Sequence, residues 1–110
     1  MHILIADSDA GIRRELRGML QQLGHTVAAA VDGREVVTQV RQRSYDLAVM
    51  ATELPFGDYR QIARDLAREQ RLPILLRLGD TTTTQILDFT KIPVYGYVFT
   101  PLRFPMLQTA

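Results

Sequence analysis

The sequence predicts an α/β protein, a three-layer α/β/α sandwich around a five-stranded parallel sheet in the order 2-1-3-4-5. Short, continuous apolar runs, typical of strands buried on both faces, alternate with segments whose apolar residues recur at helical spacing. Five such runs fit into 110 residues without a repeat or a linker between them. This length suits one domain, and strands that alternate with helices form parallel sheets through right-handed crossovers.

The first expected strand covers residues 2–6, and a helix follows it. Ser8 or Asp9 can cap this helix, and Gly24 can end it. The apolar positions that predict the helix are Ile12, Leu16, Met19, Leu20 and Leu23.

The next two strands are expected at residues 26–31 and 45–51. Between them, Asp32 and Gly33 form a turn into a second helix. The apolar positions of that helix are Val36, Val37 and Val40.

The second half continues the alternation. A loop at residues 54–58 precedes a third helix, whose apolar positions are Ile62, Ala63, Leu66 and Ala67. Strands are expected at residues 73–78 and 94–99, on either side of a threonine-rich and therefore weaker helix at 81–90. Pro101 ends the last strand. Because Pro105 interrupts the ten residues that remain, the last helix is expected to be short or truncated.

The predicted strand order is the flavodoxin-like one. In such sheets, binding sites lie beyond the carboxyl ends of the strands, near the point where the strand order reverses. The segments expected there are Asp7-Ser8-Asp9, Ala51-Thr52-Glu53, Leu78-Gly79-Asp80 and Thr100-Pro101. The function is therefore to be sought among these residues.

Composition excludes several classes of function. The 13 basic and 12 acidic residues give a net charge of +1, which offers no argument for nucleic acid or a membrane surface as a partner. No apolar run is long enough to cross a membrane. The absence of cysteine excludes disulfides and thiolate catalysis. The first residues contain no secretory leader, so a cytoplasmic location is expected.

Six segments, in order and with matching spacing, resemble bacterial response-regulator receiver domains, and together they cover nearly the whole chain. They are residues 3–9, 31–35 and 45–51, Leu54-Pro55 with Asp58, and residues 72–76 and 96–101. The resemblance implies the receiver fold and a role in two-component signalling. It also suggests the N-terminal domain of a longer signalling protein, occupying residues 1–110.

The resemblance also implies which residues should carry the chemistry. A receiver holds Mg²⁺ with an acidic pair and an acceptor aspartate, which attacks a phosphoryl group. Here Asp7 keeps the first acidic position, Ser8 takes the second, and Asp9 follows one place later. Ala51 stands at the acceptor position. Of the family's other site residues, Leu78 replaces the switch hydroxyl, Thr100 replaces the lysine, and the mobile aromatic is kept as Tyr97.

We therefore expect a pseudo-receiver without catalytic residues or a cofactor, which is not an enzyme. Asp7 is expected to accept hydrogen bonds from nearby backbone N–H groups, although Asp7 and Asp9 could still bind Mg²⁺ loosely. Output is expected through protein contacts on the face of the fourth helix, fifth strand and chain end, where Tyr97, Phe99 and Arg103 map. A homodimer through that face is also expected. Its apolar residues in the final segment are Leu102, Phe104, Met106 and Leu107.

Two alternatives remain open. The first is residual phosphotransfer through a non-standard carboxylate, with Glu53 as the candidate. The second is a flavodoxin-like mononucleotide binder. The acidic segment after the first strand disfavours this alternative, because its negative charges would repel a phosphate group.

Arg77 interrupts an apolar strand, and a buried charge there needs a partner. Glu53 or an acidic residue of another protein is the candidate.

Overall fold

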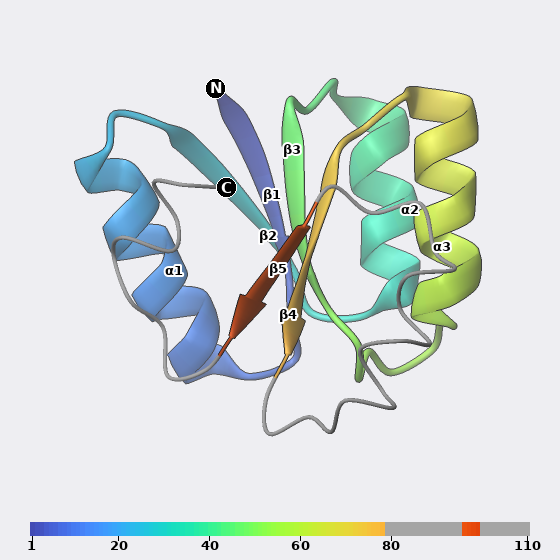
Figure 1. The fold of residues 1–110 in the computed structure, drawn as a ribbon, viewed down its shortest axis with the longest axis horizontal. Coiled ribbons are helices and arrows are strands. Elements are labelled where there is room, and N and C mark those ends of the chain that lie inside the picture. The colour runs from blue at the N-terminus through green and yellow to red at the C-terminus, as the bar shows by residue number, and fades with distance from the viewer. Residues whose placement is uncertain (79–95, 100–110) are drawn as a thin grey trace.

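The computed structural model describes residues 1–78 and 96–99, and these form a parallel sheet with helices on both faces (Figure 1). The strands are β1 (His2–Ala6), β2 (Thr26–Ala30), β3 (Leu47–Ala51), β4 (Ile74–Leu78) and β5 (Gly96–Phe99). The helices are α1 (Ala10–Gln22), α2 (Gly33–Gln42), α3 (Tyr59–Asp65) and a π-helical continuation of α3, η1 (Leu66–Gln70).

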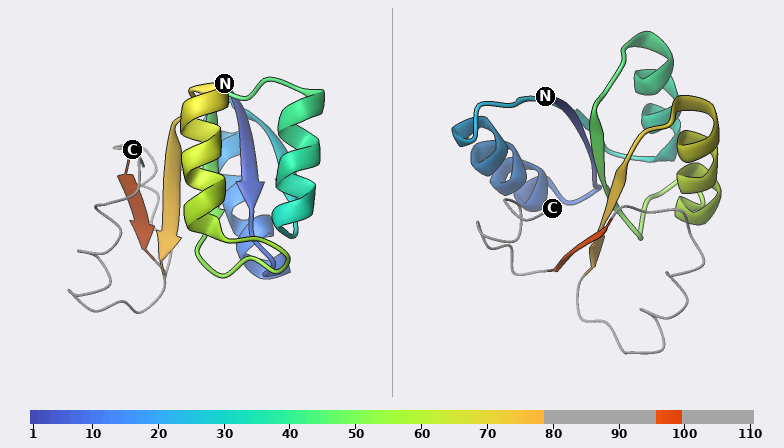
Figure 2. Two further views of the ribbon diagram at one scale, coloured as in Figure 1. Left: turned by 90° about the vertical axis from the view of Figure 1, so that its right-hand side faces the viewer. Right: turned by 45° about the horizontal axis from the view of Figure 1, so that its top comes forward.

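The sheet has the strand order β2-β1-β3-β4-β5, and all four pairings are parallel. This confirms the predicted fold class and order. β5 is the edge strand beside β4 (Figure 2). Strands β2, β3 and β4 are one or two residues shorter than predicted, and residues 94 and 95 of the predicted fifth strand lie outside the described residues. The helix expected at 81–90 and the short last helix lie outside the described residues.

The alternation of side chains along the strands divides the core into two layers. Figure 1 shows α1 on one face of the sheet and α2 and α3 on the other. Ile3 and Ile5 of β1 belong to the layer under α1, together with Leu16, Leu20, Val49 and Leu75. Leu4 and Ala6 belong to the layer under α2 and α3, together with Val36, Met50, Ala63, Leu66 and Leu76. Because helices cover both faces, the strands consist largely of apolar residues, as the sequence indicated, with Arg77 of β4 as the charged exception.

Helix α1 begins and ends at the residues that the sequence indicated. Asp9 is the N-cap, and its carboxylate accepts hydrogen bonds from the N–H groups of Gly11 and Ile12. Gly24 follows the helix with a φ of 88°. The N–H groups of Gly24 and His25 donate to the carbonyls of Gln21 and Leu20, which is the Schellman arrangement.

The start of α2 is packed against the loop between β3 and α3. Asp32 caps α2 through the N–H of Glu35. The N–H of Gly33 donates to the carbonyl of Pro55 at 2.9 Å, which brings the two backbones into contact. On the outside of this contact, the Arg34 guanidinium lies 3.8 Å from the centre of the exposed Phe56 ring. The loop is therefore fixed to the first turn of α2.

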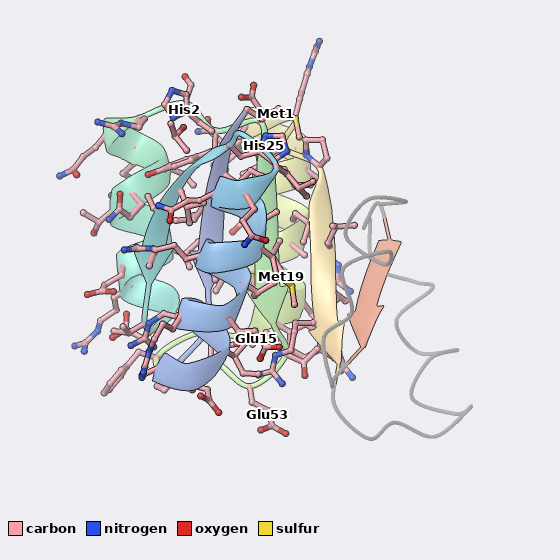
Figure 3. All side chains as sticks on the ribbon, turned by 90° about the vertical axis from the view of Figure 1, so that its left-hand side faces the viewer. Met1, His2, Glu15, Met19, His25 and Glu53 are labelled. Atoms are coloured by element: carbon pink, nitrogen blue, oxygen red, sulfur yellow. The ribbon has the colours of Figure 1, made fainter. Side chains whose placement is uncertain are left out.

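Two histidines lie at the amino-terminal ends of the first strands, where the sequence placed them as strand-end residues. His25 interacts with the amino group of Met1, and His2 interacts with the hydroxyl of Thr26. Figure 3 shows both histidines at the opposite end of the sheet from Glu53.

In the described residues, no helix is long and apolar enough to span a membrane.

Candidate functional site

The candidate site lies at the carboxyl ends of β1, β3 and β4. Ala6 pairs with Met50, so the residues that follow them, Asp7 and Ala51, stand side by side. Ala51 in turn pairs with Arg77 on β4. The three neighbouring strands therefore present a carboxylate, a methyl group and a guanidinium in a row.

Arg77 reaches across Ala51 to bind Asp7. Its Nε donates to Asp7 Oδ2 at 2.8 Å, and its Nη2 donates to Asp7 Oδ1 at 3.1 Å. The Asp7 side chain is 2% exposed and the Arg77 side chain 18%. The planar guanidinium therefore contacts both carboxylate oxygens of Asp7 with two hydrogen bonds. Such bidentate pairs are among the strong forms of ion pair.

The remaining polar groups of Asp7 also have partners. Its Oδ1 accepts a bond from the N–H of Asp9 at 3.0 Å, as the sequence suggested. Its carbonyl accepts a bond from Arg13 Nη1 at 2.7 Å, and its N–H donates to the carbonyl of Ala30. Through these hydrogen bonds, Asp7 connects the carboxyl end of β1 to α1, β2 and β4.

The oxygen ligands that a divalent cation needs are engaged elsewhere. Asp7 is bound by Arg77, the Asp9 carboxylate caps α1, and the Ala51 side chain contributes no oxygen. Across residues 1–78 and 96–99, no three acidic, histidine or cysteine side chains are grouped so as to hold a metal ion. Because Mg²⁺ requires several oxygen ligands in near-octahedral geometry, these residues do not fit a Mg²⁺ site.

Arg77 corrects one sequence-based expectation. Glu53 or an acid on another protein was the expected partner, but Asp7 of the same chain is the partner observed. Glu53 is exposed in the loop after β3, and in Figure 3 its side chain points away from the body of the domain. The two groups are not brought together because Arg77 points along the sheet toward β1.

The other expected site residues are described in part or not at all. Leu78 ends β4, and Tyr97 and Phe99 lie on β5; for these three, the structure gives the position in the strand only. Thr100 and Arg103 lie outside the described residues, as does the apolar segment Leu102, Phe104, Met106 and Leu107.

A third aspartate at this edge of the sheet, Asp32, has a pKa that its surroundings lower. Asp32, shortly after β2, is largely buried and accepts the N–H of Glu35 at 2.9 Å. That backbone hydrogen bond holds the pKa of Asp32 below its usual value, with a further contribution from Arg34, while burial opposes the shift. Asp32 is therefore a charged helix cap.

Sequence reasoning missed the Asp7–Arg77 pair, although a signal for it was present. Arg77 is the charged residue in an otherwise apolar strand, and Asp7 follows another apolar strand. Parallel strands end at the same edge of a sheet, so the two charges could be expected at the same edge. The sequence does not give the register of β1, β3 and β4. In the structure, this register places only the methyl group of Ala51 between the two charged side chains.

Comparisons with known proteins agree with this architecture. The family model for the response regulator receiver domain matches residues 3–110. The chemotaxis protein CheY of Pseudomonas aeruginosa is 28% identical over 112 residues, which cover 98% of this chain and 90% of CheY. The transcriptional regulatory protein AfsQ1 of Streptomyces coelicolor is 38% identical over 106 residues, and ZraR of Escherichia coli O157:H7 is 27% identical over 107 residues. The match covers 96% of this chain in both cases, but 47% of AfsQ1 and 24% of ZraR.

Solved structures show the same fold. A two-component response regulator from Clostridium difficile superposes with a TM-score of 0.90 at 23% identity, covering 99% of this chain and 90% of that one. The chemotaxis response regulator CheY4 of Vibrio cholerae has a TM-score of 0.87 at 20% identity, with 98% and 92% coverage.

Proposed function

Because the chain belongs to the response regulator receiver domain family, we propose that it is a pseudo-receiver, a cytoplasmic signalling module that works through protein contacts without aspartyl phosphorylation. It is a binding module and not an enzyme. The observation that carries the proposal is the row of Asp7, Ala51 and Arg77 at the carboxyl ends of three neighbouring strands. The nucleophile position in this row is a buried methyl group.

The surroundings of Ala51 support this proposal. Phosphoryl transfer to a carboxylate requires a nucleophile and cations that stabilise the charge on the transferring group. Ala51 supplies no nucleophile, and the nearby guanidinium of Arg77 is already committed to Asp7. In the sequence, Thr100 stands where the family has its lysine. Phosphotransfer through Glu53 has little support, because that carboxylate is exposed and lies in a loop.

The partners are proposed from the family and from the lengths of its members. This chain spans about half of AfsQ1 and a quarter of ZraR, two proteins named as transcriptional regulators. We propose that the domain likewise passes its signal to an output domain or to a partner protein. The contact face would include β5, with Tyr97, Phe99 and Arg103, and the same face would serve for a homodimer.

The direct test is incubation with a small acyl-phosphate donor and Mg²⁺, followed by intact-mass measurement. The wild-type chain is expected to gain no phosphoryl group. Ala51→Asp is also expected to gain none, because the new carboxylate would stand between Asp7 and Arg77 and would draw on the same guanidinium. A receiver domain that retains its acceptor aspartate serves as the positive control.

Two results would contradict the proposal at different levels. A phosphoryl adduct on the wild-type chain would mean that another carboxylate is the acceptor, and peptide mapping would show whether it is Glu53. An adduct on Ala51→Asp alone would leave the wild-type pseudo-receiver intact. It would show, however, that Arg77 and Thr100 are compatible with phosphotransfer.

A further inference from the structure

We propose that the Arg77 guanidinium is the resident cation of this site, and that it excludes Mg²⁺ from Asp7. This goes beyond the proposed function. A domain that lacks its acceptor aspartate could still bind Mg²⁺ through Asp7 and Asp9 and could respond to it. The proposal instead makes the site independent of divalent cations.

The Arg77 side chain reaches Asp7 across an intervening strand. Asp7 follows β1 and Arg77 belongs to β4, with β3 between the two strands. Neighbouring strands are about 4.8 Å apart, so the backbones of Arg77 and Asp7 are separated by two intervals, roughly 10 Å, which the long Arg77 side chain, the short Asp7 side chain and the hydrogen bonds between them bridge together. It can do so because Ala51 places only a methyl group in its way, and both hydrogen bonds to Asp7 are formed at 2.8 and 3.1 Å. The small residue at 51 and the arginine at 77 therefore form a matched set.

Both Asp7 carboxylate oxygens already accept hydrogen bonds. Oδ2 accepts from Nε of Arg77, and Oδ1 accepts from Nη2 of Arg77 and from the N–H of Asp9. A metal ion would have to displace the guanidinium from a carboxylate that is almost fully buried. It would then face the displaced positive charge at close range, because arginine does not lose its proton in proteins.

The carboxylate of Asp9, the second acid near this site, caps a helix. Asp9 is exposed, but its Oδ1 accepts the N–H groups of Gly11 and Ile12 at 2.8 and 3.1 Å. Turning this group toward Asp7 would remove the N-cap of α1. A divalent cation at this site would thus have to break the Asp7–Arg77 ion pair, and any coordination through Asp9 Oδ1 would compete with the N-cap of α1, whereas the guanidinium requires neither.

The experiment compares thermal unfolding in MgCl₂ with unfolding in NaCl of equal ionic strength, for wild type, Arg77→Ala and Arg64→Ala. Arg64 is an exposed arginine of α3 and controls for the loss of one positive charge. Backbone amide NMR shifts of Asp7 and Asp9 are recorded over the same titration. Wild type and Arg64→Ala are expected to show no response specific to Mg²⁺. Arg77→Ala, whose Asp7 is freed, is expected to be stabilised by Mg²⁺.

The expected stabilisation of Arg77→Ala by Mg²⁺ follows from the affinity of the freed site. If Arg77→Ala binds Mg²⁺ with a Kd of about 1 mM, about 10 mM Mg²⁺ raises its ratio of folded to unfolded protein roughly tenfold. A comparable stabilisation of wild type, or Mg²⁺-specific shifts at its Asp7 and Asp9 amides, would overturn the proposal. It would also be overturned if folded Arg77→Ala were as indifferent to Mg²⁺ as wild type, because Arg77 would then not be what excludes the ion.

Should Arg77→Ala not fold in NaCl, folding restored by MgCl₂ supports the proposal, and no restoration by MgCl₂ counts against it. In either case the wild-type titration still decides whether the native site takes up Mg²⁺. The outcome is independent of the phosphorylation test, since it is read from stability and amide shifts in the absence of any phosphoryl donor.

Discussion

Three aspartates at the carboxyl end of the sheet have different roles, and their surroundings determine which. Asp9 and Asp32 accept backbone N–H groups at the starts of α1 and α2. Asp7 accepts one N–H group as well, but its main partner is the Arg77 guanidinium. The same side chain therefore serves as a helix cap at two positions and as half of a buried ion pair at the third.

Asp32 should make stability depend on pH in the acid range. Its pKa is lower in the folded state than the value of about 3.9 expected for the unfolded chain. Its contribution is therefore fully present above the unfolded pKa and is lost as pH falls through the folded pKa. Asp32→Asn keeps a side-chain oxygen that can cap α2, but it removes the charge.

We expect Asp32→Asn to be less stable than wild type at neutral pH, and to approach wild type as the solution becomes strongly acidic. Urea unfolding at a series of pH values measures this difference. Glu53→Gln, which removes a negative charge from an exposed loop residue, is the control. A constant gap between Asp32→Asn and wild type at every pH would show that the charge of Asp32 does not contribute.

At the level of elements, the contact between the first turn of α2 and the β3–α3 loop requires a glycine. A Cβ on Gly33 would lie 2.6 Å from the carbonyl oxygen of Phe56 and 2.8 Å from Cα of Gly57. Both neighbours are backbone atoms, so the loop would have to move. Phe56 already has a φ of 53°, which leaves this loop little freedom to adjust.

Gly33→Ala should therefore destabilise the domain, by about 1–3 kcal/mol as for other overpacked sites. The matched control is Gly18→Ala in α1, where a Cβ would meet no atom within 4 Å. That change should instead stabilise the domain by about 0.5–1 kcal/mol, because alanine favours the helix. Chemical denaturation of both variants measures the two effects. If both variants were stabilised, the β3–α3 loop would be free to move away from α2.

Some elements of this structure can be predicted from the sequence, and others cannot. The strands and α1 could be predicted because apolar periodicity, Asp9 and Gly24 are all local signals, and the structure confirms each of them. The π-helical end of α3 has no such local signal, and the sequence did not indicate it. The partner of Arg77 depends on the register of three strands that are far apart in sequence, so periodicity alone could not identify it.

At the scale of the whole molecule, the edge strand and the apolar sequence that follows it favour association between copies of the chain. β5 is at the edge of the sheet, and α1 is the helix that covers one face within the described part of the chain. The sequence beyond β5 contains Leu102, Phe104, Met106 and Leu107, a density of apolar residues that favours burial. A two-fold dimer is the commonest way for identical chains to bury such a surface.

We expect this chain to dimerise at tens of micromolar, as measured by light scattering. Phe104→Asp should return it to a monomer, whereas Phe56→Asp, at an exposed aromatic on the α2 side of the domain, should not. A longer version of the chain, extended past Ala110, tests whether additional residues cover the apolar segment. If both lengths were monomeric, the contact face would be reserved for a different protein.

In evolutionary terms, the Asp7–Arg77 pair makes the order of mutations matter. Losing Arg77 first leaves a buried carboxylate without its counter-ion, at a cost of about 3–5 kcal/mol. Gaining an aspartate at Ala51 first puts two carboxylates beside one guanidinium. Each single step toward a site with an aspartate at position 51 and no arginine at position 77 is therefore unfavourable, although the combined change need not be. For the pseudo-receiver proposed above, this coupling between positions 51 and 77 is epistasis: neither residue can be exchanged singly without cost, so change is expected more readily at the surface residues of the domain than at this site.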